Sequence, residues 1–203
     1  MTLTIHGDRM SGNCLKVKWV AERIGAPWRW IDVDVRRGET RTPDFLRLNP
    51  AGQVPVVVLA DGRSLAQSNA IMLHLAEGSD LIPEDPYDRA RMFEWMFWEQ
   101  YTHEPAIAVR RFQKAYLNKP DSEIDPALMV RGRAALSRMQ ASLAAPGAGG
   151  FLVGGGLSLA DVALVAYTRV AHEGGFDLAE YPAVQAWVAR VEDALPIRPW
   201  AAS

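Results

Sequence analysis

Two serines stand where a loop or strand gives way to a predicted helix, and their positions suggest anion chemistry. Ser11 begins the predicted helix over residues 11–25, and Ser68 follows Gln67 at the start of the predicted helix over residues 68–77. A helix N-terminus carries partial positive charge and unpaired amides, to which a serine adds a hydroxyl. Ser68 therefore predicts a carboxylate site, and Ser11 a second site that could stabilise an anion. For each serine the simpler alternative is a plain N-cap.

The single cysteine, Cys14, is a second chemical candidate. A free thiol has a pKa near ~8.5, so only a few per cent is the nucleophilic thiolate at neutral pH. Cys14 falls on the same predicted helical stripe as Val17, Ala21 and Ile24, which indicates that it faces the core. A buried, inert thiol is the favoured interpretation, and a redox-active cysteine is the alternative. An internal disulfide is excluded because there is only one cysteine.

A proline precedes a valine-rich strand in the stretch GQVPVVVLADG, residues 52–62. Proline has no amide hydrogen, and within sheets it is confined to edges, first positions and bulges. From these residues alone, Pro55 is a trans proline that begins an edge strand.

Length and composition favour a folded enzyme that acts on a small molecule. The chain has 203 residues, of which 49% are hydrophobic and 23% charged, with a formal net charge of −2. This length buries a substantial core, and the near-neutral charge provides no electrostatic footprint for nucleic acid or an acidic membrane. The N-terminus lacks a signal-peptide pattern, and no apolar run reaches the ~18 residues of a membrane span. We expect a cytoplasmic protein.

The elements that position these residues differ between the two halves of the chain. In the first half, strands at 2–7, 28–35 and 54–62 alternate with helices at 11–25, 42–49 and 68–77, and the third strand turns at Asp61-Gly62. The predicted order is β-α-β-α-β-β-α. Residues 79–88, rich in proline and acid, predict a linker.

The second half is predicted to be all helical. Helices are expected over 89–117, with a kink or break at Pro105, and over 125–143, 158–173 and 182–195. The third of these is apolar on nearly every side, which is typical of a central helix in a bundle. Ser158 and Asp161 have capping-box spacing, with Leu157 and Val162 as the hydrophobic staple. These residues serve folding, since loss of such a cap costs ~1 kcal/mol or more.

Four motifs in this order resemble the cytosolic glutathione transferase superfamily, particularly its theta-type and related bacterial members. They are SGNC after the first strand, NPAGQVP, the pair Gln67-Ser68, and SLAD. The resemblance covers essentially the whole chain. It implies a thioredoxin-like, glutathione-binding domain over 1–78, a linker over 79–88 and an all-helical domain over 89–203.

The resemblance also implies how glutathione would bind. Pro55 would be cis, so that the backbone of Val54 faces outward and pairs with the cysteinyl backbone of glutathione. Ser68 would bind the γ-glutamyl carboxylate and Gln67 the glutamyl ammonium. Gln53 would reach the glycyl carboxylate.

One position departs from the family pattern at the glycine end of the tripeptide. Thr40 occupies the position of a family histidine, and Arg41 is the residue that would compensate. An exposed loop arginine that is merely solvated is the alternative.

Ser11 matches the serine that stabilises the thiolate in theta-like enzymes, with Asn13 or a backbone amide as alternatives for that role. The loop at Met10 and the long helix at Tyr101 would line the pocket for a hydrophobic electrophile, although aromatic residues at such spacing more often belong to a core or a subunit interface. A homodimer is implied, and Gln100 or Glu104 would reach the partner's glutathione. A metal site is not expected, because the four histidines lack ligand spacing.

The leading functional hypothesis is glutathione transfer to a hydrophobic electrophile, as in detoxification. Glutathione is the co-substrate, and neither nucleic acid nor a membrane is an expected partner. Two alternatives stay open. The same site would serve a glutathione-dependent disulfide or peroxide reductase, or the fold would serve as a non-catalytic binding protein.

Overall fold

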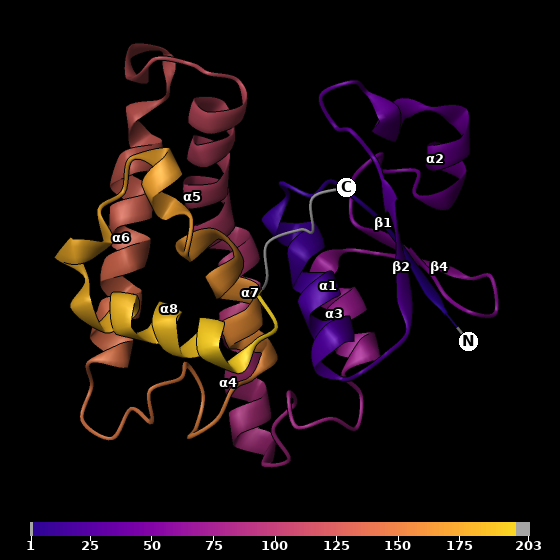
Figure 1. Ribbon diagram of the computed structural model, residues 1–203. Helices are drawn as coiled ribbons and strands as arrows, with labels where there is room; N and C mark the ends of the chain where they lie inside the picture. Colours follow the sequence, from indigo (N-terminus) through magenta and orange to yellow (C-terminus); the bar gives the residue numbers. More distant parts are fainter. Residues whose placement is uncertain (1, 198–203) are drawn as a thin grey trace. The chain divides into compact units, whose positions relative to one another are not determined.

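The computed structural model describes residues 2–197, which form two compact units. The first contains the residues up to Ser79 together with 195–197, and the second contains Asp80–Ala194. Figure 1 shows the course of the chain through its helices and strands. No helix within residues 2–197 combines the length and apolar character needed to cross a bilayer.

The first unit has the β-α-β-α-β-β-α order that its sequence predicts. Its elements are β1 (Leu3–Gly7), α1 (Gly12–Arg23), β2 (Trp28–Asp32), α2 (Pro43–Leu48), β3 (Val56–Val58), β4 (Ser64–Ala66) and α3 (Ser68–Leu75), with a 3-10 turn at Glu39–Arg41. The strand order is β2-β1-β3-β4. β1 and β2 are parallel and joined through α1, as parallel strands require a crossover, whereas β3 is antiparallel to both β1 and β4. This is the thioredoxin-like arrangement.

Alternation along β3 divides the core of this unit between the two faces of the sheet. Val57 packs with Ile5, Val17 and Ile71, which belong to β1, α1 and α3, and Figure 1 shows α1 and α3 side by side. The preceding residue, Val56, packs instead with Phe45 of α2. Successive side chains of a strand point to opposite faces, so α1 and α3 cover one face and α2 covers the other.

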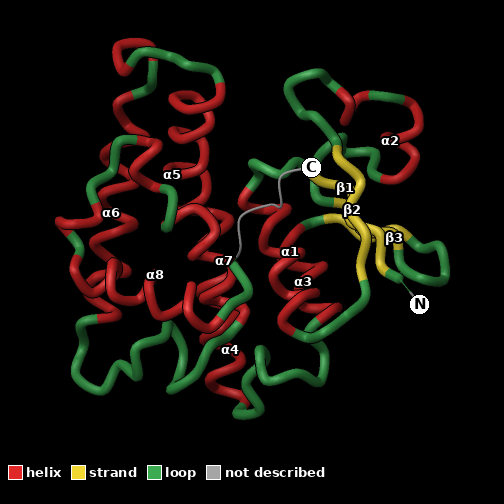
Figure 2. The backbone as a smooth tube through the Cα atoms, in the orientation of Figure 1, coloured by secondary structure: helices red, strands yellow, loops and turns green. Residues whose placement is uncertain are grey.

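The second unit is helical throughout its regular structure. It contains α4 (Pro86–Trp98), a π-helical segment Glu99–His103, α5 (Glu104–Arg111), a second π-helical segment Phe112–Tyr116, α6 (Pro126–Leu143), α7 (Leu159–Thr168) and α8 (Pro182–Ala194), with 3-10 turns at Asp121–Glu123, Ala171–Gly174 and Leu178–Glu180. α5 and α6 run side by side (Figure 2). All ten residues of α7 are buried, and α7 contacts α4, α5 and α8, which confirms the prediction of a central helix.

The predicted kink or break at Pro105 is not a break, because the helix continues past this residue. Pro105 lies in the first turn of α5, directly after the π-helical segment Glu99–His103. There the backbone bonds to the fifth preceding residue, as the Glu104 amide does to the Glu99 carbonyl. A proline is tolerated in a first turn and where the regular ladder is locally widened.

The capping box predicted at the start of α7 is present, and it is part of a larger network. The Ser158 amide and hydroxyl donate to Oδ2 of Asp161, both at 2.9 Å. Oδ1 of Asp161 also accepts from the Leu152 amide at 2.9 Å and from Nε1 of Trp187 at 2.8 Å. The carboxylate therefore joins a loop and α8 to the start of α7, which it caps.

Candidate functional site

Ser11 sits at the start of α1, as predicted, and its hydroxyl does not cap the helix. The Ser11 amide donates to the Asp8 carbonyl at 3.0 Å, and its carbonyl accepts from the Cys14 and Leu15 amides, each at 3.0 Å. No hydrogen bond joins the Ser11 side chain to the first-turn amides. The backbone of Ser11 is thus fixed at the positive end of α1.

Cys14 is fully buried, which confirms the interpretation of its helical phase. Burial disfavours the charged thiolate and raises the pKa of the Cys14 thiol to about 12, against the opposing effect of the hydrogen bond with Ser11. Since only a thiolate attacks disulfides or alkylating agents, Cys14 is unreactive in the folded protein.

Thiol titration checks this directly. The native protein at pH 8 is expected to show no thiol reactive with Ellman's reagent, and the urea-unfolded protein one thiol per chain. The raised pKa also means that the folded state holds this proton more tightly than the unfolded state. The contribution of Cys14 to stability is therefore present below pH 9.0 and is lost as the pH rises toward about 12. Rapid titration of one native thiol would contradict the assignment.

A hydrogen-bond network brings the starts of α1 and α3 together. Oδ1 of Asn13 accepts from Nζ of Lys16 at 2.7 Å and from Oγ of Ser68 at 3.4 Å, across 55 positions of sequence. Asn13 is the predicted alternative to Ser11 for stabilising the thiolate, whereas Lys16 was not predicted to belong to the site. A lysine within a helical pattern is expected to be solvent-exposed, so the sequence carries no signal for the burial of Lys16.

Ser68 is the first residue of α3 and not its N-cap, which corrects the prediction. The N-cap is Gln67, with φ 71° and ψ 112°, and the Gln67 carbonyl accepts from the Ile71 amide at 2.9 Å. A non-glycine residue at positive φ is uncommon and is typical of functional sites. Ser68 is buried, and within residues 2–197 its amide hydrogen has no acceptor. Its amide and hydroxyl thus stand together at the positive end of α3.

The loop that leads into β3 is held by Asn49. Nδ2 of this buried residue donates to the Gln53 carbonyl at 2.8 Å, its Oδ1 accepts from the Ala51 amide at 3.1 Å, and its carbonyl accepts from the Gly52 amide at 2.9 Å. Gly52 has φ +61°, which favours glycine. The side chain of Gln53 is exposed.

The Val54–Pro55 peptide bond at the end of this loop is cis. Across the described part of the chain, no hydrogen bond uses the amide or the carbonyl of Val54. Val56 pairs with Ala66 in the β3–β4 hairpin. The antiparallel pairing of β3 with β4 puts Val54, which precedes β3, and Ser68, which follows β4, at the same end of the hairpin.

Arg41 lies beside the same loop. A methyl group added at Gly52 would be 2.5 Å from Nη1 of Arg41, so the guanidinium rests against the Gly52 backbone, next to Gln53. Thr40, which stands in place of the family histidine, is buried. Of these two residues, the exposed Arg41 is the one available to a ligand carboxylate.

The two residues predicted for the electrophile pocket belong to different units. Met10 is 53% exposed, and its amide donates to Oδ1 of Asp8 at 2.9 Å. Tyr101 lies in the π-helical segment Glu99–His103 of the helical unit and is 88% exposed. Both side chains are accessible to a ligand.

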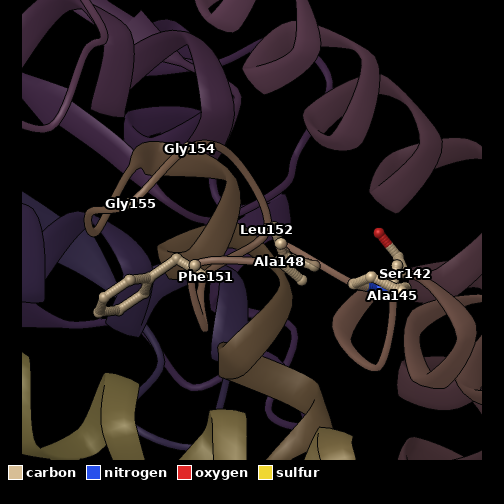
Figure 3. Close-up of a pocket in the computed structure, with 10 residues that line it drawn as sticks. Ser142, Ala145, Ala148, Phe151, Leu152, Gly154 and Gly155 are labelled. Atoms are coloured by element: carbon tan, nitrogen blue, oxygen red, sulfur yellow. The ribbon is translucent and has the colours of Figure 1, made fainter.

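A depression in the helical unit contains none of the predicted site residues. It follows the loop after α6 and is lined by Ser142, Ala145, Pro146, Gly147, Ala148, Gly149, Phe151, Leu152, Gly154 and Gly155 (Figure 3). These ten residues include no acid, base or thiol. Elsewhere, no group of three or more His, Cys, Asp or Glu side chains within residues 2–197 is arranged to hold a metal ion.

Comparison with known proteins places both halves of the chain in one family. Residues 10–77 match the model of the glutathione S-transferase N-terminal domain, and residues 100–194 match that of the glutathione S-transferase C-terminal domain. A crystal structure of a glutathione S-transferase from Xanthobacter autotrophicus Py2 is 45% identical, with TM-score 0.89, over 97% of this chain and 95% of that one.

Two further relatives, YfcG and URE2, are not named as glutathione S-transferases. The disulfide-bond oxidoreductase YfcG of Escherichia coli K12 is 29% identical over 87% of this chain and 84% of its own. Protein URE2 of Candida glabrata is 27% identical over 91% of this chain, which spans only 63% of the URE2 length. A solved structure of Ure2p in complex with glutathione is 26% identical, with TM-score 0.82, over 93% of each chain. The family models and the crystal-structure relatives together show that this chain belongs to the glutathione S-transferase superfamily.

Proposed function

We propose that this protein binds glutathione in its first unit and activates the glutathione thiol for transfer to a hydrophobic electrophile. The observation that carries this proposal is the meeting of two helix N-termini beside an unpaired backbone edge. Ser68 is hydrogen-bonded to Asn13 at the start of α1, and Val54 and Ser68 flank the same end of the β3–β4 hairpin. One extended peptide bearing a carboxylate and a thiol fits this arrangement.

In this proposal the backbone of Val54, preceded by Gln53 and followed by Pro55, pairs with the cysteinyl residue as an added strand would. The Ser68 amide binds the γ-glutamyl carboxylate, the Ser68 hydroxyl turns from Asn13 to donate to the same carboxylate, and the side-chain oxygen of Gln67 accepts from the glutamyl ammonium. Gln53 and Arg41 bind the glycyl carboxylate. The proposal is supported by the relative Ure2p, whose solved structure is a complex with glutathione.

Chemistry in this proposal starts at the sulfur. The Ser11 hydroxyl and the N-terminus of α1 stabilise the glutathione thiolate, which attacks a hydrophobic electrophile bound beside Met10. Lowering a thiol pKa by ~2 units requires about 2.7 kcal/mol, which a charge-assisted hydroxyl hydrogen bond and a helix terminus together provide. A homodimer is part of the proposal, to be checked by sedimentation equilibrium.

Disulfide reduction on the same site is the second candidate function, favoured by the relative named a disulfide-bond oxidoreductase. Because Cys14 is buried and protonated, the attacking sulfur would belong to glutathione, with a second glutathione thiol completing the reduction. The purified protein should be assayed with 1-chloro-2,4-dinitrobenzene and with hydroxyethyl disulfide. Turnover of the aryl halide supports transfer, and turnover of the disulfide alone favours reduction.

Calorimetry with glutathione tests the binding step on which both activities depend. Heat that saturates at millimolar glutathione or below supports the proposal. A third possibility is a non-catalytic binding protein, in view of the similarity to URE2. Binding without turnover of either substrate would favour that role, and the absence of binding would overturn the proposed function.

Replacing Ser68 with alanine is expected to weaken glutathione binding by about 1 to 3 kcal/mol, or roughly 5- to 150-fold in Kd, because the ligand carboxylate loses a buried hydroxyl donor. Calorimetry measures the change. Ser64→Ala is the matched control, since Ser64 is an exposed strand residue of the same unit, and it should leave Kd unchanged. Equal affinities for the two variants would remove Ser68 from the site.

Replacing Ser11 with alanine is expected to lower turnover at neutral pH by about tenfold, the effect of one charge-assisted hydrogen bond. The affinity for glutathione should stay within a few-fold of the wild type. Activity should recover as the pH rises, because the thiol then ionises without help. A pH–rate profile measures this, and unchanged neutral turnover would show that Ser11 has only a structural role.

A further inference from the structure

Lys16, in the interior of α1, is fully buried, with a relative solvent exposure of 0%. Lysine is almost never buried to this degree unless it is paired, because its ammonium loses hydration that an apolar residue would not need. Nζ of Lys16 donates to Oδ1 of Asn13 at 2.7 Å, one helical turn toward the N-terminus. The Lys16 ammonium is therefore hydrogen-bonded to a residue of the proposed glutathione site.

This contact fixes which way the Asn13 carboxamide points. A lysine ammonium has three donors and no acceptor, so only the amide oxygen of Asn13 can face it. The hydroxyl of Ser68 also lies against that oxygen, at 3.4 Å. A carboxamide turned by 180° would set its NH2 group against the ammonium, donor against donor. The NH2 group of Asn13 is thus held pointing away from Lys16.

We propose that Lys16 is a positioning residue for thiol activation: it holds the Asn13 carboxamide so that its NH2 group donates to the sulfur of bound glutathione, and its buried charge favours the thiolate. This inference rests on the proposed glutathione site. Asn13 is the second residue of α1 and follows Ser11 by two positions, so both side chains stand at the same helix terminus. The thiolate then has two side-chain donors, one from Ser11 and one from Asn13.

The other titratable groups around this corner come from three places. Asp8 follows β1. Its charge raises the pKa of Cys14, which is buried on α1 itself, whereas the charge of Lys16 lowers that pKa. β1 contributes the half-buried His6, whose pKa is lowered by burial and by Arg29. The packed helix α3 carries His74 as its one titratable side chain, exposed near the far end from Ser68. Lys16 is the cation bonded to Asn13 in this group.

The test is the thiol pKa of glutathione in its complex with the full-length protein, followed by thiolate absorbance in the ultraviolet across pH. Lys16→Met should raise that pKa by about one unit, since a nearby charge and an oriented donor are lost. Binding of S-methylglutathione, which has no ionisable thiol, should stay within twofold. Lys16→Arg retains the donors and the charge and should restore most of the effect.

A double-mutant cycle separates positioning from a general structural role. Asn13→Ala alone should raise the thiol pKa, and adding Lys16→Met to it should raise the pKa by much less than Lys16→Met does in the wild type. Additive effects would overturn action through Asn13. If Lys16→Met does not fold, as judged by circular dichroism, Lys16→Gln takes its place. Its side chain is too short to reach Oδ1 of Asn13, so the same rise in pKa is expected.

The outcomes distinguish this inference from the proposed function. If the wild type binds glutathione and the thiol pKa is the same in Lys16→Met, the role of Lys16 is overturned and the glutathione site stands. If the wild type binds neither glutathione nor S-methylglutathione, the proposed function is overturned, and the role of Lys16 with it.

Discussion

Replacing Asp161 with alanine is expected to lower the free energy of unfolding by about 3 to 5 kcal/mol, the largest effect of any single substitution considered for this protein. The Asp161 side chain is fully buried and accepts from the amides of Leu152 and Ser158, the Ser158 hydroxyl and Nε1 of Trp187. Ser158 and Trp187 are themselves buried. Alanine would leave these donors without an acceptor and without water.

Urea denaturation followed by circular dichroism measures this loss. Asp177→Ala is a matched control, because Asp177 caps a 3-10 turn through one hydrogen bond, from the Ala179 amide at 2.9 Å, in an exposed setting. It should cost about 1 kcal/mol or less. Ser158→Ala should fall between the two. Should Asp161→Ala prove no more destabilising than Asp177→Ala, the carboxylate would be an ordinary cap.

Replacing Gly132 with valine is expected to cost about 3 kcal/mol through overpacking. Gly132 lies in the middle of α6, where glycine is the poorest helix former after proline, so propensity alone predicts a small gain in stability. The structure reverses that prediction. A Cβ atom at Gly132 would lie 2.4 Å from two ring carbons of Phe176, which is itself buried. Phe176 lies in a close-packed interior, so its ring could yield only by displacing other core atoms.

Ser137→Val is the control for this substitution, since Ser137 is an exposed residue of the same helix. It introduces the same side chain with no packing partner and should change stability by less than about 0.5 kcal/mol. Thermal unfolding compares the two variants. A Gly132→Val protein as stable as Ser137→Val would show that the contact with Phe176 is readily relieved.

Much of the fold was predictable because its signals are local. Ser11 and Gly25 bracket α1, Thr42 and Pro43 begin α2, and Ser158 with Asp161 begins α7; each signal acts over a few residues of backbone. Where a local rule failed, a local exception was the reason. The helix passes Pro105 because a π-helical segment precedes it. Ser68 is not the N-cap of α3, because Gln67, which adopts a positive φ, occupies that position.

The candidate site was predictable only in part. Spacing and resemblance named Ser11, Val54 and Ser68, yet they did not show that Ser68 and Asn13 share a hydrogen bond or that Lys16 is buried. Nor could they show that Arg41 rests against Gly52. The contact of Ser68 with Asn13 depends on how α3 packs on α1, and the contact of Arg41 with Gly52 depends on how the loop before β3 lies against the 3-10 turn.

By itself, the sequence determined which segments form helices and strands, how they alternate, and which residue types stand at the helix starts, since these follow from neighbours within about one helical turn. Only the tertiary structure decided which of these residues meet. Packing of α3 on α1 joins Ser68 to Asn13, and packing of α6 against Phe176 makes a side chain at position 132 destabilising. Such contacts arise when whole elements close on a dense core, where the position of one side chain is set by all the others.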